Sequence, residues 1–111
     1  MKIAFVGFRH GHIYSLYEMA KQAQDVEIIA CVEENEAARK IAEERTGTKF
    51  SSASYHEILL GDADIIAIGA AYGDRGDIAI EALQNGKHIL TDKPLCTSLS
   101  QLETIEKLTK E

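Results

Sequence analysis

Short apolar runs alternate with longer amphipathic segments along the 111 residues of this chain. The apolar runs predict strands at residues 3–6, 26–32, 64–68 and 88–90, and a minor third strand around Lys49 and Phe50. Apolar residues at helical spacing and helix-start signals predict helices at residues 11–23, 35–46, 54–60, 77–84 and 98–108. Apolar strands that alternate with helices are typical of a parallel sheet covered on both faces. We therefore expect a single-domain α/β fold of three layers, α/β/α, with a doubly wound parallel sheet in the order 3-2-1-4-5.

Local signals set the ends of two of these helices. Asn35 can cap the second helix, and Gly47 marks its end. Within that helix, Ala38, Ile41 and Ala42 are expected to face the core. Ser54, followed by Glu57 three residues later, is a capping box that opens the short third helix.

Charge and composition exclude several classes of function. The chain carries 12 basic and 18 acidic residues, a net charge of −6, which argues against binding to nucleic acid or to an anionic membrane. The apolar run near the start stops after four residues, short of the roughly 7–15 that a signal peptide needs. The two cysteines, Cys31 and Cys96, are too few for a disulfide framework or a thiolate metal cage. We expect a cytoplasmic domain that binds neither nucleic acid nor membrane.

Four loops are candidate sites, because each follows a predicted strand. In doubly wound sheets, ligands lie beyond the carboxyl ends of the strands, at the point where the strand order reverses. The loops are residues 7–12, the pair Glu33 and Glu34, residues 70–76 and residues 91–94. We expect these segments to converge at one edge of the sheet.

The first of these loops has part of the glycine pattern of a dinucleotide-binding turn. Gly7 can form the tight turn, and the helix that follows would offer free N–H groups to phosphates. Arg9 stands at the position of the second glycine and His12 at that of the third, while Gly11 is one place early. A glycine turn that binds no nucleotide is the alternative. The candidate cofactor-binding residues of this loop are Gly7, Phe8, Arg9, His10 and Gly11.

Glu33 ends the second predicted strand, 26 residues after Gly7. A carboxylate there can accept hydrogen bonds from both ribose hydroxyls of an adenosine and repel a 2′-phosphate, which favours NAD over NADP. The alternative is a solvated acidic residue near the start of a helix. Arg9 leaves NADP possible, because a guanidinium can pair with a phosphate.

Asp92, Lys93 and Pro94 follow the last predicted strand. A lysine at the mouth of a cleft can hydrogen-bond a substrate hydroxyl and help to move its proton, so Lys93 is the candidate catalytic residue. The alternative is a strand stopped by proline, with a solvated lysine. His10 and His12 lack further ligands nearby in the sequence, so we expect no metal site.

The stretch AIEALQNGKHILTDKPL, residues 79–95, closely resembles the A-L-x-A-G-K-H-V-L-x-E-K-P-L signature of the Gfo/Idh/MocA family of sugar and inositol dehydrogenases. The similarity runs over essentially the whole chain, and residues 87–95 are its most specific part. It implies an amino-terminal NAD(P)-binding Rossmann domain at residues 1–111, with the family's substrate domain absent from this chain.

The resemblance also implies roles for individual residues. The pyrophosphate loop of the family matches residues 7–11, and the acidic residue that holds the adenosine ribose matches Glu33. The lysine between nicotinamide and substrate matches Lys93, with Asp92 in place of the family's glutamate. The loop along the nicotinamide half matches Ala70, Ala71 and Tyr72.

The sequence departs from the family pattern at the cofactor site. Because the second and third glycines are absent, the Arg9 side chain can either crowd the pyrophosphate or pair with it. Ala70 and Ala71 stand in place of a Thr-Pro pair, and Arg75 in place of a histidine.

Two classes of function follow from these observations. The first is the dinucleotide-binding domain of a dehydrogenase that uses NAD, with NADP possible, and transfers hydride at a sugar- or polyol-type hydroxyl. Without a second domain to position the substrate, such a chain would catalyse little. The second is a stand-alone nucleotide- or phosphate-binding module, or an assembly domain, without redox activity. The expected partners are a dinucleotide, a sugar- or polyol-like substrate where a second domain exists, and a second copy of the chain paired through an exposed sheet edge.

Overall fold

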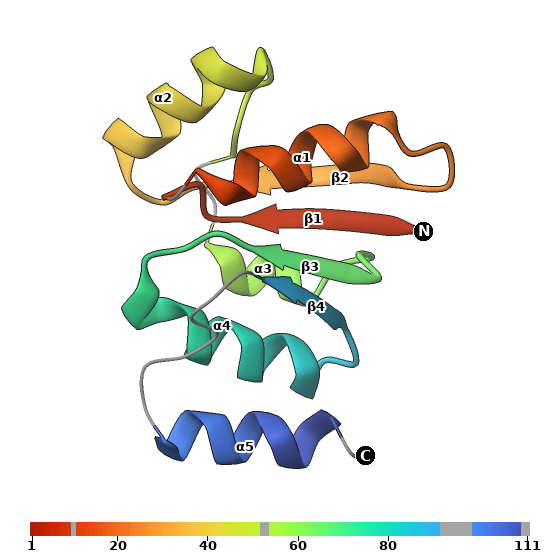
Figure 1. The fold of residues 1–111 in the computed structure, drawn as a ribbon, viewed down its shortest axis with the longest axis vertical. Coiled ribbons are helices and arrows are strands. Elements are labelled where there is room, and N and C mark those ends of the chain that lie inside the picture. The colour runs from red at the N-terminus through yellow and green to blue at the C-terminus, as the bar shows by residue number, and fades with distance from the viewer. Residues whose placement is uncertain (10, 52–53, 92–98, 110–111) are drawn as a thin grey trace.

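The structure is a computed structural model that describes residues 1–9, 11–51, 54–91 and 99–109. Strands and helices alternate along the chain, as predicted, and within the described ranges no helix is long and apolar enough to cross a membrane. In chain order the elements are β1 (Lys2–Val6), α1 (His12–Gln22), β2 (Glu27–Val32), α2 (Glu36–Thr46), α3 (Tyr55–Leu59), β3 (Ile65–Ile68), α4 (Tyr72–Gln84), β4 (His88–Thr91) and α5 (Leu99–Thr109) (Figure 1).

The sheet has four parallel strands in the order β2-β1-β3-β4. The central strand β1 pairs on both sides, so that Phe5 lies opposite Cys31 of β2 and Ala67 of β3. The chain first builds outward from β1 to β2 and then returns to the other side of β1 to form β3. This reversal makes the sheet doubly wound, as predicted, and places the switch point between β1 and β3.

The minor strand expected around Lys49 and Phe50 is reduced to a single parallel bridge between Val32 and Ser51. The Ser51 amide donates to the Cys31 carbonyl at 3.0 Å, so the chain does reach the outer edge of β2. The Phe50 amide donates instead to Glu43 Oε2 at 2.9 Å. This bond ties the segment after α2 back to that helix, on the side that faces away from β2.

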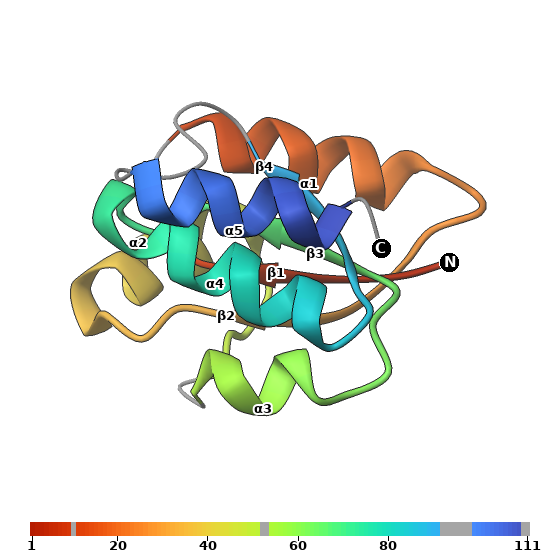
Figure 2. The same ribbon diagram turned by 90° about the horizontal axis from the view of Figure 1, so that it is seen from below.

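Side chains alternate between the two faces of the sheet and build two cores. On one face, Ile3 and Phe5 of β1 pack with buried residues of α1 and α2. On the other face, Ala4 and Val6 pack with residues of α3 and α4. Ile105 of α5 joins this second core, and α5 lies beside α4 in both views (Figures 1 and 2). The three-layer arrangement predicted from the sequence is therefore confirmed.

The second helix has the ends that the sequence predicts. Asn35 Oδ1 accepts the Ala38 amide at 2.9 Å, and Gly47 ends the helix in the left-handed conformation, with φ of 70°. The prediction for Ile41 is wrong, because its side chain is 54% exposed. The prediction for Ala42 is confirmed, because it is fully buried against the sheet.

The fourth helix begins earlier than predicted, at Tyr72 rather than at Asp77. Two glycines in residues 72–76 favour a loop by composition, but Arg75 holds this stretch in the helix. Its side chain is fully buried, and its Nε donates to the Ala70 carbonyl at 2.9 Å. The connection between β3 and α4 is consequently short, residues 69–71.

Candidate functional site

The ends of β1, β2 and β3 are tied together by backbone hydrogen bonds. The Gly7 amide donates to the Val32 carbonyl of β2, and the Gly69 amide donates to the Val6 carbonyl of β1, both at 2.9 Å. The Arg9 amide in turn donates to the Gly69 carbonyl at 2.9 Å. These bonds bring three of the four candidate loops to one edge of the sheet, as the sequence predicts.

Two glycines allow this close approach. Gly7 has φ of 90°, which disfavours any residue with a side chain, and a Cβ there would lie 2.5 Å from the Ala70 backbone nitrogen. A Cβ on Gly69 would overlap the Gly7 carbonyl oxygen and the Ile13 side chain. The tight turn predicted at Gly7 is therefore confirmed, and its partner glycine comes from the turn after β3.

The amino terminus of α1 opens toward this edge. Gly11 is its N-cap residue, with φ of −61°, and among the described residues no side chain caps the helix. A Cβ on Gly11 would meet nothing within 4 Å, so the described residues leave open space beside Gly11. Uncapped N–H groups at a helix amino terminus attract anions, because the helix dipole adds to their hydrogen-bonding capacity.

Glu33 is buried rather than solvated, with only 3% of its surface exposed. Its Oε1 accepts the Phe8 amide at 2.9 Å, while its Oε2 accepts the Asn35 amide at 2.9 Å and Arg9 Nε at 3.1 Å. Glu33 thus joins the loop after β1 to the loop after β2. Oε1 accepts one hydrogen bond and keeps a lone pair for a further donor.

The Phe8 side chain points away from this site into the core. Its ring lies 4.6 Å from the Phe50 ring, 5.3 Å from the Tyr14 ring and 5.8 Å from the Phe5 ring, measured between centroids. Aromatic pairs at such distances stabilise the fold. Phe8 therefore faces the site through its backbone alone.

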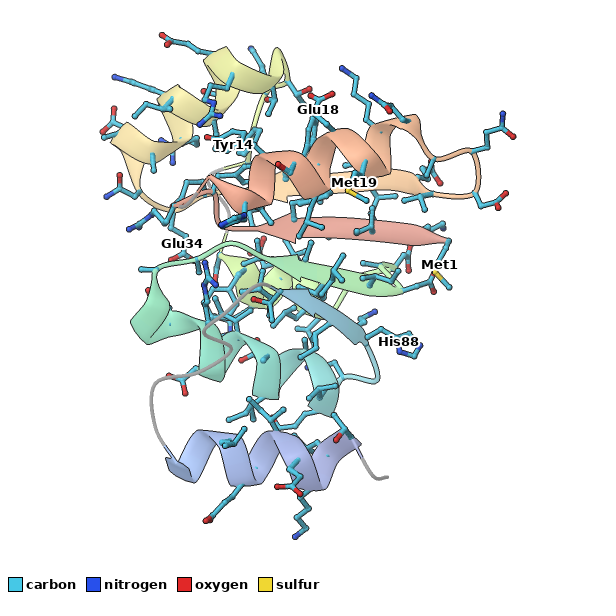
Figure 3. All side chains as sticks on the ribbon, viewed as in Figure 1. Met1, Tyr14, Glu18, Met19, Glu34 and His88 are labelled. Carbon is cyan, nitrogen blue, oxygen red and sulfur yellow. The ribbon has the colours of Figure 1, made fainter. Side chains whose placement is uncertain are left out.

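A pocket lies between these strand ends, which we call the strand-end pocket. Most of its charged groups are carboxylates, from Glu33, Glu34, Asp74 and Asp77, and Arg9 supplies the positive charge. Figure 3 shows Glu34 at this edge of the molecule, whereas Met1 and His88 lie at the opposite edge. The residues lining the strand-end pocket are Val6, Gly7, Arg9, Val32, Glu33, Glu34, Tyr55, Ala70, Ala71, Asp74, Asp77 and Ile78.

Tyr55 brings a phenol to the strand-end pocket from α3. Burial raises the pKa of Tyr55, and the carboxylates of Glu81, Asp77, Glu34 and Asp74 raise it further. The hydroxyl consequently stays protonated and can donate a hydrogen bond at neutral pH. Its backbone amide donates to Glu34 Oε1 at 3.3 Å, which fixes the start of α3 beside the loop after β2.

Apart from Phe8, the sequence-based candidates divide into three groups. Those that the structure brings together around the strand-end pocket are Gly7, Arg9, Glu33, Ala70 and Ala71. Gly11 lies next to them at the start of α1, and Tyr72 is the first residue of α4. His10, Asp92 and Lys93 lie outside the described residues.

Sequence reasoning missed several residues of the strand-end pocket. Tyr55 and Asp77 line it but fall outside the candidate loops, and Asp74 lies within the candidate loop of residues 70–76 but was given no role there. For the two aspartates a signal existed, since they fall in the first turns of the helix that follows β3. Tyr55 gave none, because α3 reaches the strand ends through tertiary packing. Across the described ranges, no group of three histidine, cysteine, aspartate or glutamate residues could hold a metal ion.

Solved structures share this fold over nearly the whole chain. A WlbA dehydrogenase from Bordetella pertussis, crystallised with NADH and UDP-GlcNAcA, is 27% identical with a TM-score of 0.77, covering 98% of this chain and 33% of its own. A myo-inositol 2-dehydrogenase from Lactobacillus plantarum is 18% identical with a TM-score of 0.80, covering 99% of this chain and 33% of its own. At that identity the second match shows the fold alone. The chain thus spans about a third of the length of both structures.

One curated protein matches part of the chain. A trans-1,2-dihydrobenzene-1,2-diol dehydrogenase from Xenopus tropicalis is 38% identical over 53 residues, which are 47% of this chain and 16% of that protein. The family model of the Gfo/Idh/MocA type, described as an oxidoreductase family with an NAD-binding Rossmann fold, matches residues 1–111. The resemblance inferred from the motif is therefore confirmed: this chain belongs to the Gfo/Idh/MocA oxidoreductase family, as its NAD-binding Rossmann domain.

Proposed function

We propose that the strand-end pocket and the uncapped start of α1 form the NAD site of this domain, with the cofactor lying across the switch point between β1 and β3. The observation that carries the proposal is the meeting of the three strand-end loops at an edge that also holds an open helix amino terminus. In doubly wound sheets this is where dinucleotides bind. The residues fit such a cofactor, because glycines bring the backbone close and the helix end offers free N–H groups to phosphates.

In this proposal, different residues bind different parts of the cofactor. The pyrophosphate lies on the turn of residues 7–11, where the α1 amides can donate to its oxygens. The adenosine ribose lies beside Glu33, whose Oε1 has a lone pair left for a hydroxyl group. The nicotinamide half runs along the short turn after β3, formed by Ala70, Ala71 and Tyr72.

The same proposal extends to chemistry in a longer protein. The bound cofactor would accept or donate a hydride at a sugar- or polyol-type hydroxyl carbon, while Lys93 hydrogen-bonds the hydroxyl and moves its proton, with Asp92 beside it. Relatives that share this fold are about three times as long. We propose that a second domain supplies the substrate contacts, so that residues 1–111 alone bind the cofactor without turnover.

An added carboxylate in the strand-end pocket tests the proposed NAD site without weakening the fold. Ala71 is the N-cap residue of α4 and makes no side-chain cap. In Ala71→Asp, the new carboxylate can cap α4, which stabilises a helix by about 0.5–2 kcal/mol. Its negative charge would at the same time repel the phosphates of a dinucleotide.

Calorimetric titration with NADH is the measurement. We expect saturable binding to the unchanged chain and at least about tenfold weaker binding to Ala71→Asp, with a melting temperature no lower than that of the unchanged chain. Gln24→Glu adds the same charge after the far end of α1 and should bind NADH as the unchanged chain does. Absence of NADH binding by the folded, unchanged chain would contradict the proposal, and so would equal affinities of the two variants.

A further inference from the structure

We infer that Arg9 makes the proposed cofactor site accept NADP as well as NAD, because it cancels the charge of Glu33 and offers its own donors to a 2′-phosphate. This inference rests on the proposed function, and it names the residue that sets cofactor choice. From the sequence alone, Glu33 favours NAD, and Arg9 only leaves NADP possible. The geometry of the Arg9–Glu33 pair leads to a different expectation.

An acidic residue rejects NADP only when its charge reaches the 2′ position of the ribose. Glu33 is 3% exposed, and three donors already share its carboxylate. Two of these are backbone amides and the third is the Arg9 guanidinium, at 3.1 Å from Oε2. A 2′-phosphate beside Glu33 therefore meets a neutralised ion pair instead of a bare carboxylate.

The Arg9 guanidinium keeps most of its hydrogen-bonding capacity. It uses Nε for Glu33, and within the described part of the chain no hydrogen bond engages its two terminal nitrogens. The side chain is 34% exposed and lines the strand-end pocket together with Glu33. A planar guanidinium with both terminal nitrogens available can hold two phosphate oxygens at once, which makes arginine a strong phosphate ligand.

The backbone of Arg9 fixes where that guanidinium can reach. Its amide donates to the Gly69 carbonyl at 2.9 Å, so the residue is anchored between the ends of β1 and β3. Among the described residues Glu33 engages the guanidinium through Nε alone, so the terminal nitrogens remain available to a phosphate. A phosphate bound there need not displace the ion pair, whereas a ribose that takes both oxygens of Glu33 must displace Arg9 from Oε2.

Three exposed carboxylates oppose the binding of a 2′-phosphate. Glu34, Asp74 and Asp77 line the same pocket, and their charges disfavour any additional phosphate. They face solvent, which screens charges over about 8 Å at physiological salt. A direct guanidinium–phosphate contact is screened less than these longer-range repulsions. We therefore expect the contact between Arg9 and the 2′-phosphate to decide cofactor choice. High salt should change the ratio of the NADH and NADPH affinities little.

Paired titrations with NADH and NADPH test the inference, using the unchanged chain and Arg9→Gln. The unchanged chain should bind NADPH with a dissociation constant within about threefold of that for NADH. Arg9→Gln removes both the counter-charge of Glu33 and the terminal donors. It should weaken NADPH binding at least about tenfold and NADH binding less than about threefold, since the lost contacts are charge-assisted. Lys21→Gln removes one positive charge from the far end of α1 and should leave the ratio of the two constants unchanged.

Arg9→Lys separates charge from geometry. It keeps the positive charge but loses the planar fork, so we expect it to restore part of the NADPH affinity that Arg9→Gln loses. Thermal unfolding of each variant confirms that the chain is folded; Glu33 keeps its two backbone donors in all of them.

The outcomes distinguish this inference from the proposed function. If NADH binds and NADPH binds more than about thirtyfold more weakly, Glu33 still rejects the 2′-phosphate and the inference is wrong. It is also wrong if Arg9→Gln weakens both cofactors equally, because Arg9 would then hold the shared pyrophosphate. If neither cofactor binds the folded chain, the proposed function itself fails, and the inference fails with it.

Discussion

Glu33→Gln tests the role of the buried carboxylate in holding two loops together. The Oε1 atom of Glu33 accepts the Phe8 amide, and Oε2 accepts the Asn35 amide and Arg9 Nε, all within 3.1 Å. Glutamine has nearly the same volume as glutamate, so the change leaves no cavity. It replaces one of the two acceptor oxygens by an –NH2 group, which can only donate.

The magnitude follows from the donors that lose their acceptor. In the less costly orientation, the glutamine oxygen faces Asn35 and Arg9, and the –NH2 group faces the buried Phe8 amide. An orphaned buried N–H costs about 1–3 kcal/mol, and the remaining bonds lose the negative charge that strengthens them. We expect the free energy of unfolding to fall by about 2–3 kcal/mol, a large part of the 5–15 kcal/mol that is typical of a whole domain.

Urea unfolding followed by far-ultraviolet circular dichroism measures this loss. With a slope of about 1–3 kcal/mol per molar urea, the midpoint should fall by about 1 M. Glu36→Gln is the matched control, because Glu36 is exposed and pairs with Lys40 on the surface at 3.5 Å. It should change stability by less than about 0.5 kcal/mol. Equal midpoints for the two variants would refute the structural role of Glu33.

Further predictions concern the backbone, a helix cap and a buried thiol. Gly7→Ala should destabilise the fold by more than about 3 kcal/mol or prevent folding, because its Cβ would lie 2.5 Å from the Ala70 nitrogen. Gly11→Ala, which has open space, should stay within about 1 kcal/mol in the same urea assay. Asn35→Ala should cost about 1 kcal/mol by loss of the α2 cap, and an unchanged midpoint would contradict that role. Burial raises the pKa of Cys31 to about 12, so the thiol stays protonated at pH 8. Iodoacetamide should therefore label it at least about tenfold more slowly in the native state than in urea, as peptide mass spectrometry would show, and equal rates would contradict its burial.

The features that could be predicted from the sequence are those with local causes. The turn at Gly7 and the caps of α2 depend on one residue and its immediate neighbours, and all have the expected form. The order of the strands could also be predicted, because four apolar runs that alternate with helices admit few parallel arrangements.

The features that could not be predicted depend on contacts between distant residues. Arg9 and Glu33 are 24 residues apart, and only the hydrogen-bonded meeting of their loops brings the guanidinium onto the carboxylate. The early start of α4 has a similar origin, because burial of Arg75 outweighs the loop tendency of the glycines around it. In each case tertiary packing decided what local propensity left open.

The most direct test of the central claim is a titration of the ¹⁵N-labelled chain with NADH, followed by amide chemical shifts. If the cofactor lies across the switch point, the largest saturable shifts should come from Gly7, Gly11, Glu34 and Ala71 at the strand-end edge. Lys2 and His88, at the opposite edge, should not move. Shifts confined to that opposite edge, or none at saturating NADH in the folded protein, would contradict the account.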